Sequence, residues 1–247
     1  MNGIPGGLVD LLKARPRLAV LTGAGMSAES GVPVFRGPGG LWEGNRPEDL
    51  ATPEAFARDP AKVWRWYRWR LERVLAAEPH AGHRALVRLG REVEEFTLVT
   101  QNVDGLHQRA GSRDVIELHG NLTRARCTAC GLRLNASRVD PDRPECGCGR
   151  GLLRPDVVWF GEALDPATAA AAWRAVERAE MVWVVGTSSV VFPAAALPRM
   201  AAERGLPVVE VNPEPTPLSG GMPFSFRTSA SEGLAALAGA LLGNAPL

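Results

Sequence analysis

Short apolar runs alternate with amphipathic stretches along most of the chain. Each run is followed within three residues by Gly, Asn or His; the runs span residues 18–21, 96–99, 115–118, 181–185 and 208–211. Runs of this length with little alternation are typical of strands buried on both faces of a parallel sheet. Helical stretches such as 167–178 and 232–242 separate several runs. The pattern therefore predicts an open α/β sheet, Rossmann-like and mainly parallel.

Two segments interrupt this alternation. Residues 38–88 are predicted to be helical and are rich in aromatic side chains, whereas residues 122–155 are polar, rich in arginine and hold all four cysteines. We interpret both as insertions, a helical module and a cysteine module, that together form a smaller domain over the cleft. The predicted large domain then comprises residues 1–37, 89–121 and 156–247.

Composition narrows the function classes. The chain has 28 Lys and Arg against 27 Asp and Glu, a formal charge of +1. So even a balance argues against a nucleic-acid coat, a polybasic membrane anchor or an acidic tail. No apolar run approaches the ~18 residues of a membrane span, and residues 1–7 lack the basic and apolar regions of a signal peptide. We expect a cytoplasmic protein that binds neither nucleic acid nor membrane; a monomer is compatible, but the oligomeric state stays open.

The four cysteines follow the pattern Cys127-x2-Cys130, fifteen residues, then Cys146-x-Cys148. A tight cluster of four thiols in a cytoplasmic chain predicts a tetrahedral zinc ion, and four ligands leave no open position, so the zinc is expected to be structural. The second pair is one residue shorter than a usual knuckle and needs a tighter turn. A redox pair or free thiols are the alternatives.

A glycine-rich turn follows the first run, at Gly23-Ala24-Gly25. Two glycines let the backbone approach a phosphate, and the next helix would point its amides at it. The spacing departs from G-x-G-x-x-G, so a plain strand–helix turn explains it as well. Because ligands of open α/β sheets bind beyond the carboxyl ends of the strands, we expect all five strand ends to face one cleft.

Five sequence blocks occur in a specific order along the chain: GVPVFRG at 31–37, TQNVDGLH at 100–107, ELHGN at 117–121, GTS at 186–188 and VNPE at 211–214. In this order and spacing the chain resembles the sirtuins, the NAD-dependent protein deacylases, from about residue 17 to about residue 242. The resemblance implies that NAD is consumed as a co-substrate and that an acyl-lysine of a protein or peptide gives up its acyl group to the ADP-ribose part. Nicotinamide and O-acyl-ADP-ribose would be released.

The resemblance also implies roles for the strand-end residues. His119 matches the family's general base, which suits an imidazole of ordinary pKa near ~6.5; a strand-end histidine bonded to backbone is the alternative. Asn102 and Asp104 match the catalytic nicotinamide pocket, although an Asx turn would use them equally well. The remaining implied NAD contacts are Gly23, Ala24, Gly25, Ser27, Glu29, Phe35, Arg36, Trp42, Gln101, Val103, Gly186, Thr187, Ser188, Asn212, Pro213, Glu214 and Ala230. The substrate backbone would add as a strand along Val158, Phe160, Gly161 and Glu162.

The helix predicted from Pro60 to about Ala77 contains the only tyrosine of the chain. Its apolar face includes Tyr67 and also Arg70, and an apolar face normally excludes an unpaired charge. Arg70 either extends to solvent or waits for an anion. The pair matches the Tyr-x-x-Arg of class III sirtuins, in which it holds the distal carboxylate of succinyl and malonyl groups, and Ala51 matches the small residue that leaves room for the longer chain.

We therefore predict desuccinylase and demalonylase activity together with some deacetylase activity. Three different functions stay open. In a broad-range deacetylase the Tyr67 and Arg70 side chains would only pack the helix; mono-ADP-ribosyl transfer would share the NAD pocket; a non-catalytic NAD or ADP-ribose sensor would be a protein of another class.

Overall fold

The computed structural model describes residues 3–34, 40–42 and 44–242. Its largest sheet has six parallel strands in the order β3-β2-β1-β7-β8-β9. The strands are β1 (Leu18–Thr22), β2 (Phe96–Thr100), β3 (Ile116–Glu117), β7 (Met181–Val185), β8 (Val208–Val211) and β9 (Phe224–Phe226). All five predicted strands are present, so the mainly parallel α/β sheet is confirmed. The sequence pattern does not reveal β9, because only three residues of the chain form it.

The side chains of each central strand alternate between two apolar layers. On β1, Leu18 and Val20 face a core shared with α1 (Gly6–Lys13), α5 (Ala81–Glu92) and α9 (Ala230–Leu242). Ala19 and Leu21 face the opposite core, against α7 (Pro166–Arg178) and α8 (Ala196–Glu203). Both faces of the sheet are therefore covered, which explains the continuous apolar runs. We call this sheet, its five helices and the short α6 (Leu106–Arg109) the large lobe.

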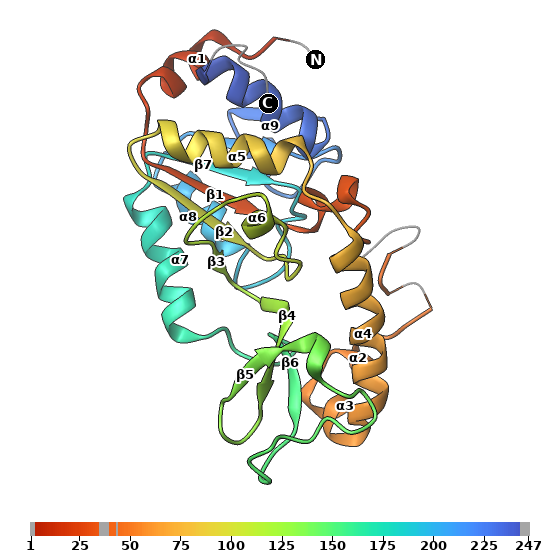
Figure 1. Cartoon of the computed structure of the whole chain (residues 1–247). Helices are drawn as coiled ribbons and strands as arrows, with labels where there is room; N and C mark the ends of the chain where they lie inside the picture. Colours follow the sequence, from red (N-terminus) through yellow and green to blue (C-terminus); the bar gives the residue numbers. More distant parts are fainter. Residues whose placement is uncertain (1–2, 35–39, 43, 243–247) are drawn as a thin grey trace.

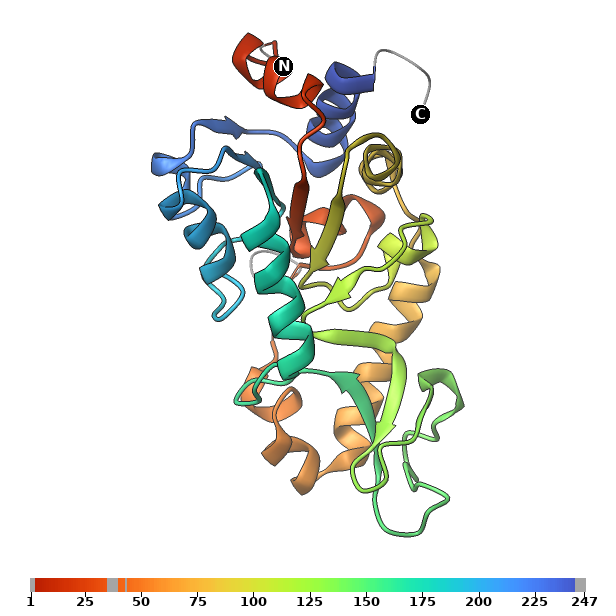
Figure 2. The same cartoon turned by 90° about the vertical axis from the view of Figure 1, so that its left-hand side faces the viewer.

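The second part of the molecule is a small lobe below the large sheet in Figures 1 and 2. Its antiparallel sheet, in the order β5-β4-β6, contains β4 (Gly120–Cys127), β5 (Arg133–Asn135) and β6 (Leu153–Val157). Helices α2 (Pro47–Leu50), α3 (Pro53–Arg58) and α4 (Pro60–Ala76) pack against that sheet around one apolar cluster. The predicted helix is confirmed: Asp59 Oδ1 caps α4 by accepting the Lys62 N–H at 2.8 Å, and Pro60 occupies the first turn.

The lobes divide the chain differently from the predicted modules. Helix α5 begins inside the segment 38–88, yet its Ala85 and Leu86 belong to the core of the large sheet. Conversely, Val157 and Trp159 follow the predicted boundary at 156 but belong to the core of the small lobe. The apolar face of each element, rather than its position in the sequence, decides which core it joins. Among the described residues, no helix is both long and apolar enough to cross a membrane.

Candidate functional site

Four strand ends meet at one cleft of about 490 Å³. It lies beyond the carboxyl ends of β1, β2, β7 and β8, as the sequence predicts for an open α/β sheet. The lining contains most of the residues expected at the cofactor; these are Gly23, Ala24, Gly25, Glu29, Gln101, Gly186, Thr187, Ser188, Asn212, Pro213, Glu214 and Ala230. Thr187 connects two walls of this cleft, since its Oγ1 accepts from Gln101 Nε2 at 3.1 Å and its carbonyl oxygen accepts from Asn212 Nδ2 at 3.4 Å.

The glycines of the first turn are explained by packing between strand ends. A Cβ at Gly23 would lie 2.7 Å from the Thr187 Cβ, and one at Gly25 would lie 2.8 Å from the Gly186 Cα. Gly186 itself has a φ of +59°, a conformation that favours glycine. The turn after β1 therefore needs glycine to lie against the turn after β7, whatever ligand the cleft holds.

His119 lies where this cleft meets a second cavity, of about 210 Å³, and lines both. Its Nδ1 is 3.0 Å from the Gln101 carbonyl oxygen, so Nδ1 carries the proton and Nε2 keeps its lone pair. Burial lowers the pKa of His119 below its usual 6.5, and the bond to Gln101 offsets this only in part. The imidazole is therefore neutral at pH 7 and able to accept a proton at Nε2. The sequence leaves two interpretations of His119, a general base or a strand-end histidine bonded to backbone. The backbone bond is present, and it fixes the tautomer that a base needs.

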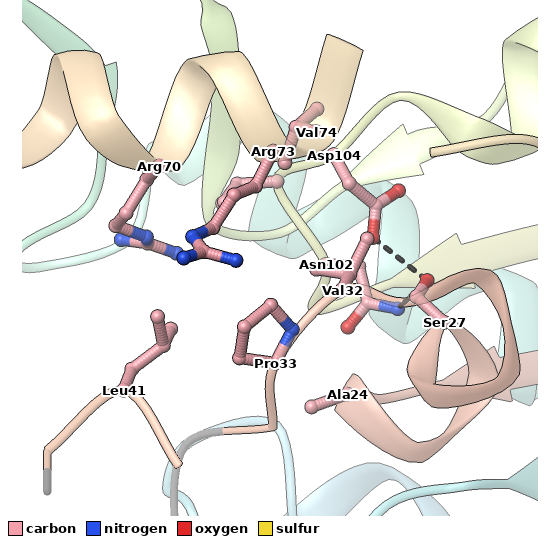
Figure 3. A pocket seen from close by; sticks show the side chains of 11 residues that line it. Ala24, Ser27, Val32, Pro33, Leu41, Arg70, Arg73, Val74, Asn102 and Asp104 are labelled. Carbon is pink, nitrogen blue, oxygen red and sulfur yellow. Dashed lines mark hydrogen bonds between the residues drawn. The ribbon is translucent and has the colours of Figure 1, made fainter. Parts of the chain in front are cut away.

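Asn102 and Asp104 form a buried network with Ser27 beside a small cavity of about 30 Å³ (Figure 3). Asn102 Nδ2 donates to the Gly23 carbonyl oxygen at 2.9 Å and to Ser27 Oγ at 3.1 Å. Ser27 Oγ in turn donates to Asp104 Oδ2 at 2.7 Å, while Asp104 Oδ1 accepts the Leu106 N–H at 2.9 Å. The Asx turn is thus present, and the same side chains fix the loop after β1. Burial raises the pKa of Asp104, against these hydrogen bonds.

The second cavity brings together the residues expected at the acyl group. Ala51, Tyr67, Arg70 and Trp159 line it, and His119 lies at its junction with the larger cleft. The Arg70 guanidinium carbon is 4.8 Å from the Trp66 ring centroid and 5.3 Å from that of Tyr67. In Figure 3 the Arg70 side chain extends from α4 toward the smallest cavity, which it also lines.

Burial shifts both titrating groups of this pair. It lowers the pKa of Arg70, against the influence of Tyr67, and it raises the pKa of Tyr67, against the charge of Arg70. At neutral pH the tyrosine therefore keeps its proton and can donate a hydrogen bond.

The expected substrate strand lies along the same cavity, and much of its backbone is already paired. The Val158 N–H donates to the His119 carbonyl oxygen at 2.9 Å, and the Phe160 N–H donates to the Ala51 carbonyl oxygen at 3.0 Å. The Glu162 carboxylate accepts hydrogen bonds from Nη1 and Nη2 of Arg154, at 2.5 and 2.8 Å. Glu162 therefore fixes the turn, while Val158, Phe160 and Gly161 line the cavity.

Several expected contacts lie elsewhere. Trp42 stacks on Trp66, with ring centroids 5.3 Å apart, and lines the second cavity (called the acyl cavity below) rather than the larger cleft. Glu29 lies at the larger cleft, but its carboxylate accepts the N–H and the hydroxyl proton of Ser231 at the start of α9. Phe35 and Arg36 lie outside the described residues. Val103 and Ser27 line the smallest cavity.

Sequence reasoning missed Glu210, the single acidic residue of β8. Its carboxylate is 1% exposed and accepts hydrogen bonds from Ser219, Ser225 and Arg227, at 2.6 to 2.7 Å. Arg227 also donates to the Asn212 carbonyl oxygen at 3.3 Å, so this network supports the loop that borders the cleft. A lone glutamate inside an apolar run was the signal that could have revealed it.

The four cysteine sulfurs cluster in the small lobe, all within 4.8 Å of one another. The Cys127–Cys148 and Cys130–Cys146 Sγ pairs are each 3.8 Å apart. Zn–S bonds of about 2.3 Å in a tetrahedron place sulfurs about 3.8 Å apart, so the geometry fits zinc. The Ala129 and Cys130 N–H groups point at the Cys127 Sγ from 3.4 and 3.5 Å, and they lower the pKa of that thiol to about 6. The predicted tight turn is made by Gly149, with a φ of +68°.

Comparison with known proteins adds a family to this geometry. Residues 23–193 match the Sir2 family. The chain is 55% identical over 216 residues to "NAD-dependent protein deacylase 2" of Pyrobaculum aerophilum, covering 86% of each chain. The crystal structure of a Sir2 homolog–NAD complex is 46% identical, with a TM-score of 0.88, covering 96% of this chain and 94% of that one. A Sir2 variant bound to a deacetylated p53 peptide and 3′-O-acetyl ADP-ribose is 33% identical, with a TM-score of 0.84, covering 94% and 96%.

Proposed function

The chain belongs to the Sir2 family, and we propose that it is the kind of NAD-dependent protein deacylase that prefers lysines carrying a succinyl or malonyl group. NAD dependence and protein deacylation follow from the family, since close relatives carry that name and a similar structure binds NAD. The choice of acyl group is the finer part of the proposal and rests on the acyl cavity. We also infer a cytoplasmic location, in line with the composition.

The larger cleft is proposed to hold the ADP-ribose part of NAD. Its walls combine backbone groups of the glycine turn with the hydroxyls of Thr187 and Ser188 and the exposed carboxylate of Glu214. Such donors and acceptors suit phosphates and ribose hydroxyls. Asn102 and Asp104, in the buried network near the entrance, are proposed to hold the nicotinamide group. The four thiolates of the small lobe are proposed to bind one structural zinc ion.

The catalytic work of the chain centres on His119. NAD, when bound, supplies the ribose carbon that takes the acyl oxygen as nicotinamide leaves. His119 Nε2 lies at the junction of the two cavities, where it would accept the proton of a ribose hydroxyl. The Gln101 carbonyl oxygen holds the Nδ1 proton and so fixes the tautomer that makes Nε2 the base.

One observation carries the acyl preference: a partly buried guanidinium lies in the wall of the acyl cavity beside a buried tyrosine hydroxyl. The Arg70 guanidinium carbon lies over the Trp66 ring, 4.8 Å from its centroid. The N–H groups of a guanidinium lie in its own plane, where they suit the two oxygens of a carboxylate. An acetyl group offers no charge to this pair, whereas a succinyl or malonyl group carries one at its far end.

The test measures kcat/KM on matched peptides carrying succinyl-, malonyl- and acetyl-lysine. We expect a preference for the two acidic acyl groups. Arg70→Met removes the charge and is expected to lower the succinyl-to-acetyl ratio about 10- to 100-fold, since a hydrogen bond to a charged group contributes about 1.5–3 kcal/mol. Arg65→Met is the matched control, because Arg65 lies on the same helix but pairs with Asp142 at the surface, 2.7 Å away.

A wild-type enzyme that favours acetyl-lysine, or an Arg70→Met variant that keeps the wild-type ratio, would contradict the proposal. The first result would favour a broad-range deacetylase. Mass spectrometry of the products distinguishes ADP-ribosyl transfer from NAD sensing. Protein-bound ADP-ribose would indicate the transfer reaction. If no nicotinamide is released under any condition, the protein is a sensor.

A further inference from the structure

The hydroxyl of Tyr67 is held from a distant part of the chain. Tyr67 is 2% exposed, and the indole Nε1–H of Trp159 donates to its oxygen at 2.9 Å. The guanidinium carbon of Arg70, one turn along α4, lies 5.3 Å from the Tyr67 ring centroid. The indole N–H therefore approaches the phenolic oxygen from one fixed direction, with the Arg70 charge close to the same ring.

This arrangement determines what the hydroxyl can do next. A phenol has one proton and an oxygen that accepts. Because Trp159 donates to the oxygen, the O–H bond of Tyr67 must point in another direction. Because burial raises the pKa of Tyr67, the proton is retained at neutral pH. Tyr67 thus faces the acyl cavity as a donor, which is the role that a bound carboxylate requires.

Trp159 is itself fixed from both its ring and its backbone. The Arg154 guanidinium carbon lies 3.4 Å from the centroid of the Trp159 ring, and Phe56 packs with its ring centroid 5.3 Å away. Arg154 also pairs with Glu162, and Glu162 Oε2 accepts the Trp159 backbone N–H at 2.8 Å. Arg154 is 6% exposed, so the pair is shielded from water and holds the indole in one orientation.

We propose that Trp159 is a positioning residue for acyl selectivity: its indole N–H orients the Tyr67 hydroxyl so that the proton points at a carboxylate on the acyl chain. The inference rests on the proposed preference for succinyl and malonyl groups. If Trp159 only packed the apolar core, its loss would weaken activity on all acyl groups alike. A positioning role instead predicts a selective loss on the acidic acyl groups.

Trp159→Phe keeps an aromatic ring and removes the N–H. We expect the succinyl-to-acetyl ratio of kcat/KM to fall about five- to tenfold, the effect of one hydrogen bond of about 1 kcal/mol, mainly through a higher KM for the succinyl peptide. Because both rates come from one preparation, the ratio does not depend on the fraction of folded enzyme. Trp64→Phe is the matched control: its Nε1 donates to the Leu153 carbonyl oxygen at 2.7 Å in the same core, and the ratio should stay at the wild-type value.

A double-mutant cycle separates positioning from packing. In a Tyr67→Phe background the hydroxyl is gone, so adding Trp159→Phe should change the ratio less than about twofold. An equal fall in both backgrounds, or an unchanged ratio in the single variant, would overturn the inference. If Trp159→Phe does not fold, 3-benzothienylalanine at position 159 replaces the N–H by sulfur at nearly constant shape and must give the same fall. A wild-type enzyme without a succinyl preference would instead refute the proposed function itself.

Discussion

The two lobes bury their strands by different means. In the large lobe the central strand β7 is buried along its whole length and consists only of Met, Val and Trp. In the small lobe β6 is equally buried, yet it carries Arg154 and Asp156, which are 6% and 8% exposed. Asp156 accepts from Arg133 at 3.0 Å and from Arg124 at 3.3 Å. Buried ion pairs add little net stability but demand one geometry. The large lobe also buries one charge, since Glu210 of β8 is 1% exposed and pairs with Arg227 at 2.7 Å, but β6 buries two charged side chains within three residues. The lobe proposed to select the acyl group thus relies more on polar geometry, and the lobe proposed to hold NAD relies more on apolar packing.

Removing the proposed zinc ion should separate the two lobes most strongly. Structural zinc contributes about 10–16 kcal/mol in small zinc domains. Treatment with a strong chelator, or Cys127→Ser, should therefore unfold β4–β6 while β1, β2 and β7 stay folded. Hydrogen exchange read by mass spectrometry checks this segment by segment, and metal analysis should find one zinc per chain. An equal loss of hydrogen-exchange protection in both lobes would show that the zinc site does not stabilise the small lobe separately.

Removing the proposed base should affect every substrate alike. His119→Asn keeps a polar side chain but no basic nitrogen, and we expect kcat to fall about 10²- to 10⁴-fold. The fall should be equal on succinyl and acetyl peptides, because the residue lies at the junction with the large lobe and not at the far end of the acyl cavity. Steady-state kinetics on both peptides checks this. A fall confined to one acyl group would contradict this prediction, because it would show that His119 also contributes to the choice of acyl group.

Mild acid should weaken the large lobe first. The rings of three histidines contact one another: His80 meets His83 edge-on and His83 is tilted against His107, with ring centroids 4.3 and 5.0 Å apart. Burial lowers the pKa of His83 to about 2 and that of His107 to about 3. The unfolded chain takes up protons below about pH 6.5 while the folded chain does not, so stability is complete above that pH and falls toward pH 3. The expected loss is about 1.4 kcal/mol per pH unit for each of His83 and His107.

Urea unfolding at pH 7, 6 and 5, followed by hydrogen exchange in α5 and α6, measures this loss. His83→Leu should make the pH dependence shallower by about one proton. A dependence unchanged by that variant would assign the acid sensitivity to other groups.

The large lobe was predictable because its strands follow one simple rule. A strand buried on both faces of a parallel sheet is apolar throughout, and β1, β2, β7 and β8 are mostly so. The strand ends then gather at one cleft by topology alone, which is why so many of the expected cofactor residues do line it. From the sequence alone, close approach to a phosphate explains the glycines of the first turn. In the structure, close packing against Gly186 already requires them.

The small lobe resisted prediction because its buried positions are charged. Arg154 and Asp156 indicate surface in any hydrophobicity pattern, and only their ion-pair partners make burial tolerable. Glu162 pairs with Arg154 from eight residues away, and Arg133 pairs with Asp156 from 23 residues away. The bond from Trp159 to Tyr67 joins residues 92 positions apart. Local sequence patterns carry no information on such a contact. The family resemblance could point to Tyr67 and Arg70, but not to the side chain that orients them.

The short segment from Val158 to Phe160 has a mechanical consequence. Its Val158 N–H donates to the carbonyl oxygen of His119, which lines the larger cleft, and its Phe160 N–H donates to the carbonyl oxygen of Ala51 in the small lobe. The same segment lines the second cavity. A displacement of the His119 backbone would therefore pass through one hydrogen bond to the wall of the second cavity, so the shapes of the two cavities are mechanically linked.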